Sequence, residues 1–74
     1  MKEHIDYLST LFVGIDIASR IHVISALDFN EEFYIKMKPV ENTQDGAALM
    51  EQMISDVLKH NHQFKYVVIG MEAT

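Results

Sequence analysis

Leu-Phe-Val-Gly-Ile-Asp, at residues 11–16, and Val-Val-Ile-Gly-Met-Glu, at residues 67–72, are two stretches of the same form that decide the fold. Each is a short apolar run without a helical period, and in each a glycine stands two positions before a carboxylate. Apolar runs of this length that are rich in Val and Ile are typical of strands buried on both faces of a sheet. We therefore expect two buried strands that each end on an acid.

The spacing of glycine and acid places both on one face of each strand. Because side chains alternate along a strand with a period of two, Gly14 shares a face with Asp16, and Gly70 shares a face with Glu72. In parallel neighbouring strands both acids would lie at the same end of the sheet, beside space that the glycines leave open. Two close carboxylates repel each other and favour a shared proton or a cation. The pair is a candidate Mg²⁺ or Mn²⁺ site, since both ions prefer oxygen ligands.

The length and composition of the chain indicate one small globular domain. The 74 residues are 49% apolar and 23% charged, which is ordinary for a folded domain, and without Cys there is neither a disulfide nor a thiolate-bound zinc to stabilise it. The net charge of −5 argues against unaided binding to nucleic acid, because Lys and Arg drive phosphate binding. It does not exclude a nuclease centre, which is itself acidic and contacts phosphate through its metal ions.

No segment of the sequence indicates membrane insertion or secretion. The apolar runs fall well short of the roughly 20 residues of a membrane-spanning helix. At the N-terminus Lys2 is followed by Glu3 and Asp6, without the apolar core of a signal peptide. We therefore expect a cytoplasmic protein with no membrane partner.

The N-terminal half begins with an arm and a hairpin. Residues 1–10 mix charged and apolar side chains without a clear period, and we expect an N-terminal arm there. The apolar residues of this arm are candidates for packing on the sheet: Ile5, Tyr7 and Leu8. We interpret residues 11–17 and 21–28 as strands, and because so few residues join them, they form an antiparallel hairpin.

A third, half-exposed strand is expected at residues 33–39. One face of this strand carries Phe33, Ile35 and Met37, and the other carries Tyr34, Lys36 and Lys38. The two lysines suit an edge strand, because their charge discourages pairing with other chains, and contact with DNA is the alternative explanation. Pro39 is expected to end the strand, since it has no N–H to donate to a neighbour.

A helix follows, with Asn42 or Thr43 as its N-cap. Its apolar side chains recur at spacings of three and four and form one stripe: Met50, Met53, Ile54, Val57 and Leu58. Gly46 is a weak helix former in the first turn, which indicates close packing at that point. We expect the helix to end near residues 60–61 and residues 65–71 to form the fourth strand.

The order of the elements predicts the topology of the sheet. A helix that connects two strands of one sheet favours a parallel, right-handed crossover. The fourth strand is as apolar as the first, so we expect the two to be neighbours. The sequence therefore predicts an α/β fold with a mixed sheet in the order 3-2-1-4, one crossover helix, and Asp16 next to Glu72.

Several short motifs, taken together, resemble those of a known family. They are, in chain order, Gly14-Ile15-Asp16, His22, Leu27-Asp28, Asn42-Thr43, Asp45-Gly46 and Ile69-Gly70-Met71-Glu72-Ala73-Thr74. In this order and at these spacings they resemble the N-terminal RuvC-like domain of the DEDD transposases of the insertion sequence 110 group, from about Phe12 to Thr74. Three antiparallel strands, a helix and a parallel strand likewise resemble the first half of a ribonuclease H-like fold.

This resemblance implies a function in DNA transposition. In the family, four acids in the order Asp-Glu-Asp-Asp bind Mg²⁺ and cleave DNA, and Asp16 matches the first of them and Glu72 the second. Family members also carry two further acids and a C-terminal domain with a serine implicated in strand transfer, and they act with an element-encoded RNA. The resemblance thus implies that residues 11–74 are a truncated ribonuclease H-like (RuvC-like) catalytic half-domain that acts on DNA within a longer protein and is inactive alone, with Asp16 and Glu72 as catalytic and metal-binding residues.

Two other functions stay open. Actin-like sugar kinases and ATPases also begin with an apolar strand, Gly and Asp before a hairpin, but they usually place Gly or Thr in that turn to hold phosphate. Residues 18–20, Ala-Ser-Arg, contain no Gly, which counts against this hypothesis. The third hypothesis is a noncatalytic assembly module that forms a homodimer through the exposed edge of the fourth strand.

The remaining polar residues of interest have ordinary structural explanations. His22 fits a hydrogen-bonding residue within a strand rather than a site residue. His60 and His62 follow a helix end, where cationic side chains suit the helix dipole, and this explains them better than a metal pair. Ser19 and Arg20 fit a solvated turn, with contact to a phosphate as the alternative.

Overall fold

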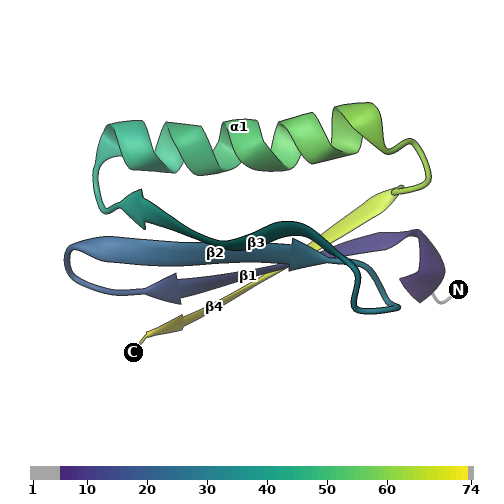
Figure 1. Ribbon diagram of the computed structural model, residues 1–74, viewed down its shortest axis with the longest axis horizontal. Helices are drawn as coiled ribbons and strands as arrows, with labels where there is room; N and C mark the ends of the chain where they lie inside the picture. Colours follow the sequence, from purple (N-terminus) through teal and green to yellow (C-terminus); the bar gives the residue numbers. More distant parts are fainter. Residues whose placement is uncertain (1–5, 74) are drawn as a thin grey trace, which may run out of the picture.

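The computed structural model describes residues 6–73; residues 1–5, which include Ile5 of the expected packing set, and Thr74 lie outside the described residues. The elements follow one another as a short 3-10 helix, three strands, a helix and a strand: η1 Tyr7–Ser9, β1 Thr10–Ile17, β2 Ile21–Leu27, β3 Phe33–Glu41, α1 Gln44–His60 and β4 Tyr66–Ala73. Figure 1 shows α1 lying along one side of the sheet. Within residues 6–73, no helix combines the length and apolarity needed to cross a membrane.

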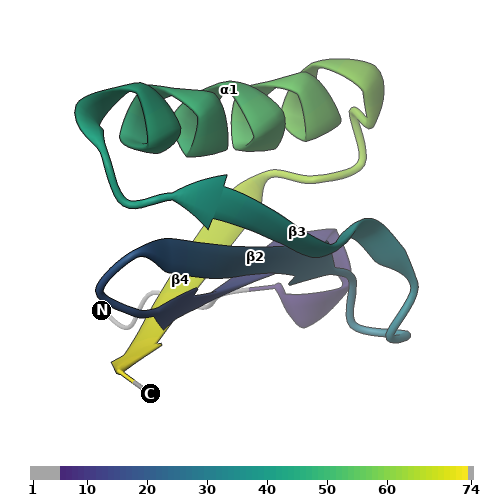
Figure 2. The ribbon, with the colours of Figure 1, turned by 60° about the vertical axis from the view of Figure 1, so that its left-hand side comes forward.

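The strands of the described residues form one mixed sheet in the order β3-β2-β1-β4. β1 pairs with β2 and β2 pairs with β3 in antiparallel fashion, whereas β1 and β4 are parallel. α1 leaves β3 at one edge of the sheet and leads back to β4 at the other edge (Figure 2). The predicted mixed sheet, its strand order and its crossover helix are therefore confirmed.

The hydrophobic core lies between the sheet and α1. Alternate residues of β1 point into it, and Leu11, Val13 and Ile15 are all buried. The predicted apolar stripe of α1 packs against this cluster from the opposite side: Met50, Met53, Ile54, Val57 and Leu58. Each fully buried aliphatic side chain contributes roughly 1.5–3 kcal/mol, so one face of the sheet and one face of the helix supply most of the stabilisation.

The segment before β1 forms a capped turn. The Asp6 carboxylate accepts hydrogen bonds from the Leu8 N–H at 3.1 Å and the Ser9 hydroxyl at 2.9 Å. Thr10 is fully buried and donates its hydroxyl hydrogen to the Asp6 carbonyl at 2.7 Å. Thr10 is therefore the first residue of β1 rather than the last residue of an N-terminal arm, and Leu8, expected to pack on the sheet, is 67% exposed.

β3 does not keep the predicted alternation of faces. The backbone of Met37 is in the left-handed region, with φ 48°, and the pairing of β3 with β2 shifts register twice, which is the signature of β-bulges. One of the shifts inserts an extra residue into β3 between Ile35 and Lys38. Ile35 and Val40 therefore point to the same side, and both are buried although they are five positions apart. Phe33 and Met37, expected to share a face with Ile35, are 44% and 66% exposed.

Pro39 does not end β3. It pairs with Val23, and the strand continues to Glu41. A proline is tolerated here because β3 is an edge strand, so a missing N–H on its free side removes no hydrogen bond. The predicted end of this strand was therefore two residues short.

β4 is an edge strand among the described residues, not a strand buried on both faces. Val67 packs against the core, but Ile69 and Met71, on the same side of the strand, are 48% and 65% exposed. The reason is that α1 covers one face of the sheet and packs over β3 rather than β4. β4 thus carries more apolar side chains than the described residues bury.

Two connections at one end of the sheet are tied together. Asn42 donates its backbone N–H to the Arg20 carbonyl at 2.9 Å and its side-chain amide to the Ser19 carbonyl at 3.2 Å. Thr43 is the N-cap of α1, and its hydroxyl accepts the Gly46 N–H at 3.0 Å. Of the two predicted caps, Thr43 fills that role, while Asn42 holds the β1–β2 turn.

Gly46 confirms the predicted close packing, because an added Cβ overlaps the Glu41 carbonyl and comes within 3.1 Å of Val40 Cγ1. We expect Gly46→Ala to lower the free energy of unfolding by about 1–3 kcal/mol, as overpacking does, when it is measured by urea denaturation. The matched control is Ala48→Gly at an exposed position of α1, where the loss reflects helix propensity alone and amounts to about 1 kcal/mol. A gain of stability in Gly46→Ala would contradict the packing argument.

Candidate functional site

The parallel register of β1 and β4 brings the two predicted acids together. Gly14 pairs with Gly70, and Asp16 pairs with Glu72, so the Gly-x-acid patterns of the two strands match position for position. Residues paired across a sheet hold their side chains on the same face at close range. The structure therefore confirms the predicted placement of Asp16 next to Glu72.

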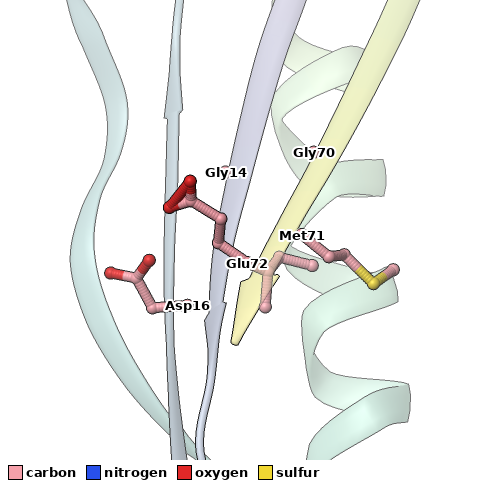
Figure 3. Close-up of a pocket in the computed structure, with 6 residues that line it drawn as sticks. Gly14, Asp16, Gly70, Met71 and Glu72 are labelled. Carbon is pink, nitrogen blue, oxygen red and sulfur yellow. The ribbon is translucent and has the colours of Figure 1, made fainter. Parts of the chain in front are cut away.

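Both acids lie on the face of the sheet that α1 does not cover. Val13 and Ile15 point into the core, so Gly14 and Asp16, which alternate with them, point away from it. Figure 3 shows the side chains of Asp16 and Glu72 on one side of their strands and Met71 on the other. Both carboxylates are exposed, so they are hydrated and open to ligands from solvent.

A hollow of about 380 Å³ lies beside the two carboxylates. It is lined by three residues from each strand: Gly14, Ile15, Asp16, Gly70, Met71 and Glu72. An added Cβ at Gly14 or Gly70 would meet no atom within 4 Å, so the glycines leave open space rather than accommodate a close neighbour. The glycines and the acids together make a recess with negative charge at one end.

The two carboxylates beside this recess are groups that could take part in holding a cation. Two neighbouring carboxylates attract a divalent cation, and Mg²⁺ binds in proteins through one or two carboxylates with water or substrate oxygens completing its shell. Within residues 6–73 no cluster of three or more His, Asp or Glu side chains is arranged to hold a metal ion. Asp16 and Glu72 alone would therefore supply only part of the ligand set of a cation, with water or phosphate oxygens at its remaining positions.

The three histidines of residues 6–73 lie away from this recess and contact the backbone. His22 is buried on the helix side of the sheet, and its Nδ1 accepts the Ala18 N–H at 3.1 Å, which closes the β1–β2 turn. A ring nitrogen of His60 lies 2.8 Å from the Asp56 carbonyl, and one of His62 lies 3.0 Å from the Lys59 carbonyl. These contacts fit the structural roles expected of all three histidines.

Three of the basic residues lie in the β1–β2 turn or on the edge strand β3. Arg20 lies in the β1–β2 turn, directly after the strand end that carries Asp16, and is exposed. Lys36 and Lys38 lie on β3, at the edge opposite β4, and Lys36 sits over the Phe33 ring at 5.5 Å from its centroid. Arg20 thus directly follows the strand end that carries Asp16. Lys38 lies near the same end but two strands away, since it pairs with Ile24, and Ile24 pairs with Ile15.

Aromatic residues that the sequence reading did not assign to the site extend its face. Phe12 precedes Gly14 by two positions and so shares its face, and its ring stacks on Tyr7 at 6.2 Å between centroids. Tyr7 in turn stacks on Phe29 at 6.1 Å. The period of two along β1 was the signal that could have placed Phe12 beside the recess, whereas the approach of Tyr7 depends on the fold of η1.

Comparison with known proteins assigns no family. No family model matches the chain, and no curated protein or solved structure is similar to it.

The recess predicts that Gly14 and Gly70 are not required for folding, in contrast to Gly46. We expect Gly14→Ala and Gly70→Ala to keep or raise the free energy of unfolding, by up to about 1 kcal/mol, because glycine weakens a strand and the new methyl group meets no neighbour. Urea denaturation of both variants measures this. A loss of more than 1 kcal/mol in either variant would show that the space beside the acids is filled by packed atoms.

Proposed function

We propose that the chain is part of a transposase catalytic domain with a ribonuclease H-like (RuvC-like) fold, whose function is Mg²⁺- or Mn²⁺-dependent cleavage of DNA strands. The observation that carries the proposal is the pairing of Asp16 with Glu72, on adjacent parallel strands, beside the recess that Gly14 and Gly70 leave open. Exposed, paired acids are what a metal-dependent nuclease needs at the point where a phosphate enters.

The topology supports the same proposal. The sheet order β3-β2-β1-β4 with a helical crossover between β3 and β4 is the arrangement expected from the resemblance to the DEDD transposases of the insertion sequence 110 group. In that arrangement the carboxyl ends of two neighbouring parallel strands carry the acids. Proteins with one fold can have many different functions, so the topology supports the proposal only together with the two acids.

Asp16 and Glu72 are the residues that would hold the cation. Their exposure lets a hydrated Mg²⁺ approach without first stripping all its water, which this ion resists. When bound, Mg²⁺ supplies a positive charge that stabilises a phosphate under attack. Gly14 and Gly70 keep the neighbouring face of the sheet clear, so the backbone of a DNA strand can approach the two acids without a steric barrier.

The charge of the chain sets a limit on what it does alone. With a net charge of −5 it repels a phosphate backbone, so we propose that DNA, and an element-encoded RNA if one takes part, are held by other parts of a full-length protein. Two carboxylates also leave the metal shell incomplete. The proposal therefore expects metal binding by this chain, but DNA cleavage only when further acidic ligands are supplied.

A Mn²⁺ titration followed by amide NMR tests the site, because Mn²⁺ broadens the signals of nearby nuclei. We expect selective loss of amide signals from residues 14–17 and 70–73, since Asp16 and Glu72 would hold the ion between these two segments. Asp16→Asn should abolish the selective broadening. The matched control is Glu51→Gln, which removes an exposed acid from α1 and should leave the broadening unchanged.

Diffuse broadening over the acidic surface, equal in Asp16→Asn and the wild-type chain, would contradict the proposed metal site. An ATP titration of the same sample separates the proposal from the actin-like kinase alternative. We expect no ATP-dependent shifts in residues 18–20, because this turn has no glycine with which to enclose a phosphate. Shifts there without Mn²⁺ broadening at the acids would favour the kinase reading instead.

A further inference from the structure

The two edges of the sheet are built differently. β3, at one edge, carries the features by which proteins prevent edge strands from pairing with other chains: two register shifts, a residue at φ 48°, a proline and two lysines. Its irregular backbone and its charges leave no straight run of free hydrogen-bonding groups. This edge is protected against association.

β4, at the other edge, carries none of these features within the described residues. It runs for eight residues without a bulge, a proline or a lysine. Four of its apolar or aromatic side chains are large and exposed: Tyr66 at 42%, Val68 at 38%, Ile69 at 48% and Met71 at 65%. A long, regular and apolar edge strand is a template for pairing with another strand.

We propose that β4 pairs with β4 of a second copy of this chain, in antiparallel fashion about a two-fold axis, so that two four-stranded sheets become one continuous sheet. A two-fold axis makes the same surface serve both partners, which closes the assembly as a dimer. This inference concerns the edge that β4 has among the described residues, and it does not rest on the proposed nuclease function.

The hydrogen bonds of β4 restrict the register of such a pairing. The N–H of Lys65, the residue before β4, donates to the carbonyl of Ser9, the residue before β1, at 2.7 Å, so it is directed to the β1 side. Because the backbone groups of a strand point alternately to its two sides, the groups of Tyr66, Val68, Gly70 and Glu72 are directed at the free edge. In an antiparallel pair, two opposed residues must both point toward each other, so only residues of this set can form the hydrogen-bonded pairs.

One of the allowed registers opposes Ile69 to Ile69 of the partner subunit. In this register Tyr66 pairs with Glu72 of the partner subunit, and Val68 pairs with Gly70 of the partner subunit, each twice by symmetry. The central isoleucines occupy a position without hydrogen bonds between them, where cross-strand side chains approach most closely. The pairing would form about eight backbone hydrogen bonds, two for each of four opposed pairs.

Charge is compatible with this register. Repulsion between two copies of a chain with net charge −5 must be avoided at the contact, and Glu72 is the one charged residue of β4. Antiparallel pairing places the two Glu72 side chains at opposite ends of the contact. Each Glu72 then lies beside an aromatic ring, whose edge carries partial positive charge, rather than beside another acid.

The dimer also completes the recess. Tyr66, Val68, Gly70 and Glu72 share the face of the sheet that carries Asp16. Val68 of the partner subunit would lie beside the empty space at Gly70, and Tyr66 of the partner subunit would lie beside Glu72. The open side of the recess would thus be walled by two residues of the second copy, and the recess would occur twice in the assembly.

Sedimentation equilibrium tests the dimer, with EDTA present so that no divalent cation influences the result. We expect a dimeric mass for the wild-type chain and a monomeric mass for Ile69→Lys, since a charge at the centre of the edge prevents pairing. The control is Leu49→Lys on α1, which removes an apolar side chain of nearly equal exposure, 51%, and should remain dimeric. Far-UV circular dichroism checks that both variants fold. A monomeric wild-type chain, or a dimeric Ile69→Lys, would overturn the proposal.

Cysteine cross-linking tests the register, because the chain has no Cys of its own. Ile69→Cys should form an intersubunit disulfide on mild oxidation, since the two Cα atoms of directly opposed residues lie within disulfide range. Val68→Cys and Gly70→Cys should cross-link much less, because each would oppose its own copy only in a register shifted by two residues. Efficient cross-linking at either of these positions, with little at residue 69, would overturn the proposed register. The readout is independent of metal binding, so it can fail while the metal site is confirmed, and the reverse.

Discussion

The parallel pairing of β1 with β4 is the constraint on which the rest of the structure depends. It joins two segments from opposite ends of the chain, and it makes α1 a crossover that covers one face of the sheet. Burial fixes its register: a slip of one residue would turn Val67 away from the core and Glu72 toward it. The same burial that stabilises the helix side of the sheet therefore sets the position of Asp16 and Glu72 on the other side.

Much of this fold could be predicted from the sequence, because the spacing of apolar residues indicates the strands and the helix directly. The run of β1, the stripe of α1 and the parallel return of β4 each have a local signature, and together they determine the strand order. The bulged β3 could not be predicted in the same way. Its register depends on how it meets β2, where the Met37 N–H donates to the Ser25 hydroxyl at 3.0 Å, and no local pattern records that contact.

The candidate site, like the fold, could be predicted only in part from the sequence. The juxtaposition of Asp16 and Glu72 follows from a period of two and a parallel pair, so the sequence was sufficient for it. The free edge of β4 was expected, but the exposure of Ile69 and Met71 was not, because an apolar run has the same sequence whether it is buried by its own chain or by a partner. The lysines that protect the edge at β3 were likewise expected, whereas the two register shifts of that strand are found only in the structure. Because β4 lines the acidic recess and its edge is unprotected, a strand that pairs with β4 would also lie beside the recess.

A double-mutant cycle between Asp16 and Glu72 tests most directly whether the two acids face each other. The free energies of unfolding of Asp16→Asn, Glu72→Gln and the double variant would be measured at low salt with EDTA. The account predicts that each single change stabilises the chain by about 0.2–1 kcal/mol, that the second change adds little to the first, and that the effect shrinks as salt is added. Strictly additive changes that do not depend on salt would contradict the central claim that β1 and β4 bring these two charges together.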